Sequence, residues 1–129
     1  IVGCQIIREP DGLALSSRNV LLGDRPAALS ISRGLFAAAD AVEAGARSAV
    51  ELEALVEEAL SLDTVDYVTL ASQSRSQPLD RLDRPAFLAV AGRIGSVRLI
   101  DNLPVDLVGE MFVPDRGRRL AEYSRLTRP

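Results

Sequence analysis

The stretch "AFLAVAGRIGSVRLIDN", residues 86–102, decides the fold. It contains two short runs rich in Val, Leu and Ile, which is the composition of β-strands. Gly95 and Ser96 lie between the runs and are residues that favour a tight turn. A similar run, "VDYVTL", stands earlier in the chain, so the sequence predicts a small antiparallel sheet. The predicted strands are Val65–Leu70, Ala86–Ala91 and Val97–Ile100.

Two helices are predicted before these strands. Asp24 is a suitable N-cap for the first helix, Pro26 is tolerated in its first turn, and Gly45 ends it. Ser48 and Glu51 have the S-x-x-E form of a capping box, which starts the second helix. Because the link between them is short, the helices should form an antiparallel pair. The apolar stripes are Ala28, Ile31, Leu35, Ala38 and Val42, then Leu52, Leu55, Val56 and Ala59.

The remaining segments of the chain lie outside these predicted helices and strands. Residues 1–7 form an apolar run that resembles a buried strand, followed by a turn at Pro10–Gly12 and a loop over 13–22. The polar stretch 72–85 has no apolar period and is predicted to be a loop. The predicted class is therefore α+β, a helix pair packed on a small antiparallel sheet. The tail, 103–129, is interrupted by Pro104 and Pro114, and Arg116–Tyr123 is a candidate short basic helix.

Composition excludes several kinds of function. The 129 residues carry a formal net charge of −3, so bulk attraction to nucleic acid or to an anionic membrane is not expected. No apolar window is long enough to span a membrane. The absence of His excludes His-liganded metal sites, and no metal-binding residue is predicted in this chain. The single Cys4 excludes an internal disulfide and fits a reducing cytoplasm.

The stretch "DGLALSSRN", residues 11–19, is the best candidate for chemistry. Ser16 and Ser17 can donate hydrogen bonds to phosphate oxygens, and Arg18 offers bidentate recognition of the same oxygens. Nucleotides usually bind at the carboxyl ends of strands in open α/β sheets, which is where this loop would lie. The alternative is an ordinary polar loop in which Arg18 is solvated, and the spacing alone leaves both interpretations open.

The wider pattern resembles the pantothenate synthetase family, the pantoate–β-alanine ligases. The similarity runs from Ile1 to about Asn102 and rests most specifically on "DGLALSSRN" and on the closing "RLIDN". The resemblance implies an N-terminal Rossmann-like domain and a smaller C-terminal domain. It also implies ATP, pantoate and β-alanine as substrates, with Mg²⁺ accompanying the ATP. ATP and pantoate would give pantoyl adenylate and pyrophosphate, and the amine of β-alanine would then displace AMP.

The resemblance also assigns roles to residues of this chain. Leu15, Ser16, Ser17 and Arg18 would form the counterpart of the KMSKS loop of the related class I aminoacyl-tRNA synthetases, which folds over ATP. Ser16 and Arg18 would be the main phosphate contacts, and Leu15 would pack near the nucleotide. The backbone of Ile7 would meet the adenine. The chain departs from the family pattern at Gln5, usually Pro, and at Val20, often Tyr.

The chain opens within a strand-like run and without Met, which predicts a piece of a longer protein. The family's H-x-G-H-type motif and phosphate-binding Lys would precede Ile1, so this chain alone is expected to be inactive. Residues 1–22 would be the last strand and the loop of the nucleotide-binding domain. Residues 23–102 would be the C-terminal α+β domain, and 103–129 a tail of uncertain structure.

Other features have ordinary structural interpretations. The Arg cluster at the C-terminus and the Glu cluster of the second helix are expected to be solvated, and Cys4 to be buried. Asp101 and Asn102 are expected to cap or turn the chain, with an interdomain contact as the lesser alternative. A different class of function also stays open, namely an interaction module that self-associates as a homodimer through unpaired strand edges. The Arg cluster is Arg116, Arg118, Arg119, Arg125 and Arg128, and the Glu cluster is Glu51, Glu53, Glu57 and Glu58.

Overall fold

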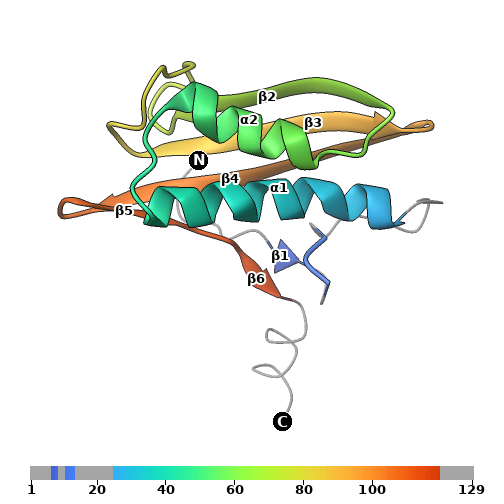
Figure 1. The fold of residues 1–129 in the computed structure, drawn as a ribbon, viewed down its shortest axis with the longest axis horizontal. Coiled ribbons are helices and arrows are strands. Elements are labelled where there is room, and N and C mark those ends of the chain that lie inside the picture. Colours follow the sequence, from blue (N-terminus) through green and yellow to red (C-terminus); the bar gives the residue numbers. More distant parts are fainter. Residues whose placement is uncertain (1–6, 9–10, 14–24, 120–129) are drawn as a thin grey trace, which may run out of the picture.

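A computed structural model describes residues 7–8, 11–13 and 25–119, and for Ile7, Arg118 and Arg119 only the backbone. Two helices lie on one face of a four-stranded antiparallel sheet with strand order β2-β3-β4-β5 (Figure 1). A short parallel pair, β1-β6, lies beside α1. The elements are β1 Ile7–Arg8, α1 Arg25–Glu43, α2 Ala49–Ala59, β2 Thr64–Ser72, β3 Ala86–Ile94, β4 Val97–Val108, β5 Met111–Pro114 and β6 Arg118–Arg119.

The helices form where the sequence predicts them, and Asp24, the predicted N-cap of the first, lies outside the described residues. The five residues of the first apolar stripe are all buried, so α1 places that face on the sheet. Gly45 ends the helix in a left-handed conformation, with φ at +109°, and the Ala46 N–H donates to the Ala41 carbonyl oxygen at 2.9 Å. Ser48 caps α2, since its side chain accepts from the Glu51 N–H at 3.4 Å. Figure 1 shows the two helices running in opposite directions, as predicted.

The sheet differs from the prediction in length. Strand β4 runs to Val108 and passes through Pro104, which we expected to interrupt the segment. Pro104 lacks only the N–H donor, and its carbonyl oxygen still accepts from the Asp115 N–H at 2.8 Å. The chain therefore stays extended, and β5 pairs with the end of β4.

The predicted basic helix at Arg116–Tyr123 is wrong for the residues that the structure describes. Gly117 has φ at +82° and its N–H donates to the Asp115 carboxylate at 2.9 Å, which makes a turn in place of a helix. Residues 118–119 then pair with β1 as strand β6. Tertiary pairing has overridden the local preference of this segment.

The core lies between the helices and the sheet. The predicted loop 72–85 contributes to it, because Leu82 is 1% exposed and its N–H donates to the Arg47 carbonyl oxygen at 2.7 Å. No helix among the described residues is long and apolar enough to cross a membrane. The fully buried large apolar side chains are Leu35, Leu52, Leu70, Leu82, Leu88, Leu103, Val42, Val56, Val90 and Val105.

Gly34 allows the two helices to approach each other closely. A Cβ atom at this position would lie 2.9 Å from the Val56 carbonyl oxygen and 3.1 Å from its Cα. Replacing Gly by Ala in a helix normally stabilises it by about 1 kcal/mol. Here the new methyl group would press on backbone that cannot turn aside, and overpacking of this kind costs about 1–3 kcal/mol.

We therefore expect Gly34→Ala to lower the free energy of unfolding by about 1 kcal/mol net of the gain in helix propensity, as measured by urea unfolding followed by circular dichroism. Ala37→Gly, on the same helix, measures the propensity effect by itself. A Gly34→Ala chain that is more stable than the parent would contradict the close approach.

Candidate functional site

The phosphate loop predicted from the sequence falls largely outside the described residues. Leu15, Ser16, Ser17 and Arg18 all lie there, so their positions are not tested. Ile7 is described through its backbone alone, which pairs with residue 118 in the β1-β6 pair. What the structure does describe is the base of the loop, namely the segments that enter it at 11–13 and leave it at Arg25.

Arg8 forms the centre of this base. Its side chain is 0% exposed and its guanidinium donates to both carboxylate oxygens of Asp101, at 2.7 Å from NH1 and 3.2 Å from NH2. The guanidinium carbon also lies 5.0 Å from the centre of the Phe36 ring, which adds a cation–π contact. Strand β1 is thereby fixed to strand β4 and to helix α1.

Asp101 lies inside strand β4, paired with Val90, and is 5% exposed. Asn102 also lies in β4, paired with Ala89, so the expectation that these two residues cap or turn the chain is wrong. Burial raises the pKa of Asp101, and the hydrogen bonds from Arg8 act in the opposite direction. A charged pair taken out of water adds little net stability while both partners are present, but either partner left alone would be a buried, unpaired charge.

The Gly12 carbonyl oxygen is held from two sides. It accepts from Arg8 NH1 at 3.1 Å and from the Ser32 hydroxyl at 2.7 Å. Gly12 has φ at +102°, a conformation that residues with a side chain rarely adopt. Leu13 follows, 4% exposed, as part of the core. The chain thus enters the loop from a fixed point.

The two ends of the loop are joined by an ion pair. Arg25, the first residue of α1, donates from Nε to Asp11 Oδ2 at 2.6 Å and from NH2 to Oδ1 at 2.9 Å. These hydrogen bonds lower the pKa of Asp11. The pair is exposed by more than a third, so solvent screens it and it fixes geometry more than it adds stability.

Comparison with known proteins finds the same family that the motifs of this chain indicate. The family model "Pantoate-beta-alanine ligase" matches residues 1–104. This chain belongs to the pantoate–β-alanine ligase family. The pantothenate synthetase of Geobacter sp. (strain M21) is 47% identical over 107 residues, which is 79% of this chain and 38% of the relative. That of Ruminiclostridium cellulolyticum is 40% identical over 121 residues, 89% of this chain and 40% of the relative.

Solved structures show the same likeness. The crystal structure of pantothenate synthetase from Thermus thermophilus superposes with a TM-score of 0.71 at 37% identity, covering 79% of this chain and 38% of that one. The chain therefore spans about two fifths of the length of the pantothenate synthetases that it matches. Arg8, Gly12, Ser32 and Asp101 all lie inside the region that the family model matches.

Sequence reasoning missed Arg8, Ser32 and Asp101 as the residues that hold the base of the loop. Strand alternation held a usable signal for Asp101, because residues 97, 99, 101 and 103 share one face and the others on that face are apolar. A carboxylate on a buried face needs a cationic partner. Arg8, which follows the apolar run within the family-like motif, was the candidate for this cationic partner.

The Glu cluster of α2 lies mostly at the surface, and of the Arg cluster only the Arg116 side chain is described. Glu51, Glu57 and Glu58 are exposed, whereas Glu53 accepts from the Leu70 N–H of edge strand β2 at 2.9 Å. Arg116 is not simply solvated, since it pairs with carboxylates of α1. Cys4, Arg125 and Arg128 lie outside the described residues. No group of three or more acidic or sulfur side chains in the described part of the chain could hold a metal ion.

Proposed function

We propose that this chain contributes the ATP-phosphate loop and the adjoining α+β unit of a pantoate–β-alanine ligase. The observation that carries this proposal is the anchored base of the loop, joined to a family match that includes "DGLALSSRN". Both ends of the segment 14–24 are tied down, by Gly12 and Leu13 on one side and by the Asp11–Arg25 pair on the other. A loop that must close over a polyphosphate needs a rigid base, because misplaced donors stabilise less of the developing charge.

The proposed reaction makes pantothenate in two steps. The carboxylate of pantoate attacks the α-phosphate of ATP, which gives pantoyl adenylate and pyrophosphate, and the amine of β-alanine then displaces AMP. Ser16, Ser17 and Arg18 would donate hydrogen bonds to the phosphate oxygens as negative charge moves onto the leaving pyrophosphate. Leu15 and the Ile7 backbone would contact the nucleotide. Mg²⁺ would shield phosphate charge when bound with ATP, and we assign it no ligand in this chain.

The proposal includes pantoate and β-alanine as the substrates of the full-length enzyme and the cytoplasm as its location. We propose that the chain alone does not release pyrophosphate from ATP and pantoate, because it spans about two fifths of the length of the family members that it matches. Measurable release by the 129-residue chain would contradict that part.

Arg18→Ala tests the loop directly. A charge-assisted hydrogen bond to a phosphate contributes about 1.5–3 kcal/mol, so we expect the affinity for MgATP to fall about tenfold or more in an isothermal titration. Arg18→Lys keeps the charge but loses the planar fork of the guanidinium group. Its affinity for MgATP should therefore lie between those of the parent and of Arg18→Ala. Arg84→Ala is the matched control, because Arg84 is exposed and pairs with its neighbour Asp83. Equal affinities for Arg18→Ala and the parent would refute the role of the loop.

A second candidate, self-association, has its own observation. The described strands expose large apolar side chains, with Ile100 53%, Val108 64% and Met111 69% exposed. Strands β2 and β5 are the edges of the four-stranded sheet, and an edge strand can pair with a strand from a second copy wherever its backbone groups are not already bonded, as the Leu70 N–H of β2 is to Glu53. The mass of the chain in solution tests this candidate, since a monomer would refute self-association and leave the loop proposal unaffected.

A further inference from the structure

The family model ends at residue 104, yet the structure folds the residues that follow it onto the base of the loop. We propose that residues 115–119 are a positioning brace, which holds strand β1, and through it the proposed ATP-phosphate loop, against helix α1. The functional meaning of the brace rests on the proposed function. Its structural basis rests on contacts that are independent of any nucleotide.

The first contact is through the backbone. Strand β6 pairs in parallel with β1, with Ile7 opposite Arg118 and Arg8 opposite Arg119. The Arg116 carbonyl oxygen accepts from Arg8 Nε at 2.7 Å. Arg8 is fully buried, so a missing acceptor would leave a buried donor unsatisfied, which is costly. The brace therefore completes the set of partners that fixes Arg8.

The second contact is through the Arg116 side chain. Its NH2 donates to Asp40 Oδ1 at 2.6 Å and to Glu43 Oε1 at 2.8 Å, while NH1 donates to Glu43 Oε2 at 3.1 Å. Both carboxylates lie in the last turn of α1. The hydrogen bonds from Arg116 lower the pKa of Glu43. One residue thus joins the end of α1, by its guanidinium, to Arg8, by its carbonyl oxygen.

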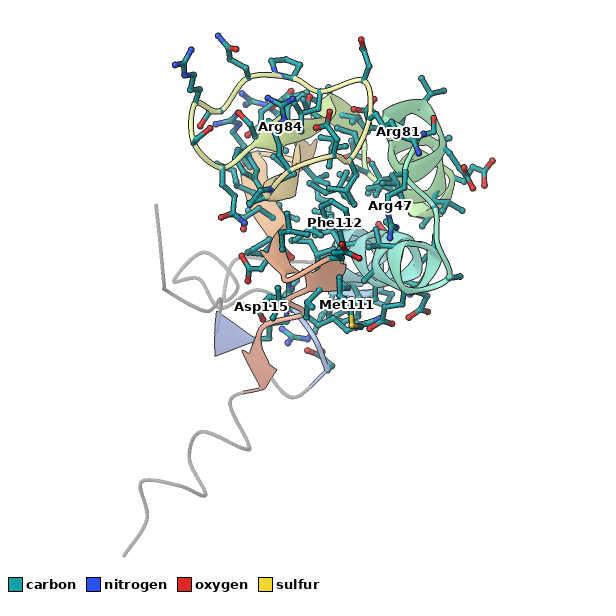
Figure 2. The ribbon with its side chains drawn as sticks, turned by 90° about the vertical axis from the view of Figure 1, so that its left-hand side faces the viewer. Arg47, Arg81, Arg84, Met111, Phe112 and Asp115 are labelled. Carbon is teal, nitrogen blue, oxygen red and sulfur yellow. The ribbon has the colours of Figure 1, made fainter. Side chains whose placement is uncertain are left out.

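The third contact ties the brace to the sheet. The Asp115 N–H donates to the Pro104 carbonyl oxygen of β4, and the Asp115 carboxylate accepts from the Gly117 N–H. Figure 2 shows Asp115 at the bend between β5 and β6. Gly117, with φ at +82°, lets the chain turn from the sheet toward β1. Strand β4, helix α1 and the brace together enclose Arg8.

Hydrogen–deuterium exchange of the 129-residue chain without nucleotide tests the brace. We expect Arg116→Ala to speed exchange of the amides in residues 7–13 about fivefold, at the upper end for an ion pair near the surface. Exchange in β2 and β3 should stay unchanged. Arg116→Lys should restore slow exchange in part, since Lys keeps one ion pair but loses the fork. Arg84→Ala, which removes an exposed Arg elsewhere, is the control and should change nothing in residues 7–13.

The partners on α1 complete the test. The double variant Asp40→Asn, Glu43→Gln should reproduce the Arg116→Ala effect, and combining all three changes should add nothing further. Additive effects, unchanged exchange in residues 7–13, or a uniform rise that includes β2 and β3 would each overturn the brace. Because no ATP is present, these results are independent of the Arg18→Ala titration, and either proposal can fail without the other.

Discussion

Asp101→Ala is expected to lower the free energy of unfolding by about 3–5 kcal/mol, one of the largest effects of any single substitution in this chain. The substitution leaves the Arg8 guanidinium fully buried and without its counter-charge. Its other acceptors, the Gly12 and Arg116 carbonyl oxygens and the Ser32 hydroxyl, are neutral. Urea unfolding followed by far-ultraviolet circular dichroism measures the loss, which suits a chain without Trp.

A surface carboxylate provides the matched control. Asp66 pairs with Arg98 at 3.1 Å but is partly exposed, so Asp66→Ala should cost about 1 kcal/mol or less. The double variant Arg8→Met, Asp101→Leu removes both charges and should recover much of the loss, because a well-packed apolar pair can replace a buried ion pair. If Asp101→Ala were no worse than Asp66→Ala, the buried pair would not have the role described.

Gly92→Val is the second substitution with a large expected effect. A Cβ atom at Gly92 would lie 2.4 Å from Leu62 Cδ1 and 2.6 Å from the Thr64 carbonyl oxygen. Overpacking usually costs about 1–3 kcal/mol, and a branched side chain at this position should reach the upper end. The measurement is again the free energy of unfolding in urea.

Leu62→Ala separates the two contacts. The Leu62 side chain can move or be removed, whereas the Thr64 carbonyl oxygen belongs to the backbone of β2. We therefore expect Gly92→Val combined with Leu62→Ala to recover only part of the loss. Full recovery of the stability would mean that crowding against the Thr64 carbonyl oxygen is unimportant. An unchanged stability for Gly92→Val alone would contradict the close contacts at Gly92.

Much of the fold follows from the sequence because its signals are local. The apolar stripe of α1, the Ser48 cap and the turn at Gly95 depend on residues a few positions apart, and the structure confirms each of them. The length of β4 could not be predicted from local signals, because Pro104 reads as a break unless the pairing with β3 and β5 is known. Leu82 was missed for a similar reason, since the two Leu residues of this polar stretch, Leu79 and Leu82, are too few to define a period.

The sequence predicts the loop residues of the candidate site but not the residues that hold the base of the loop. The proposed phosphate-binding residues come from a motif, and they lie outside the described residues. The base of the loop depends on Arg8 meeting Asp101 and Arg116, residues far apart in sequence that nothing local brings together. The sequence therefore indicates what the loop would bind, and the structure adds what fixes its ends.

The β1-β6 pair has a consequence for the order of folding. Arg8 and Arg116 are 108 positions apart, whereas the α1-α2 hairpin and the β2-β3-β4 meander join neighbouring segments. Closing so long a span is entropically slow compared with forming local contacts. We expect the helix pair and the meander to assemble first and β1 to dock last, so that the proposed phosphate loop would acquire its fixed base only after residue 119 has been synthesised.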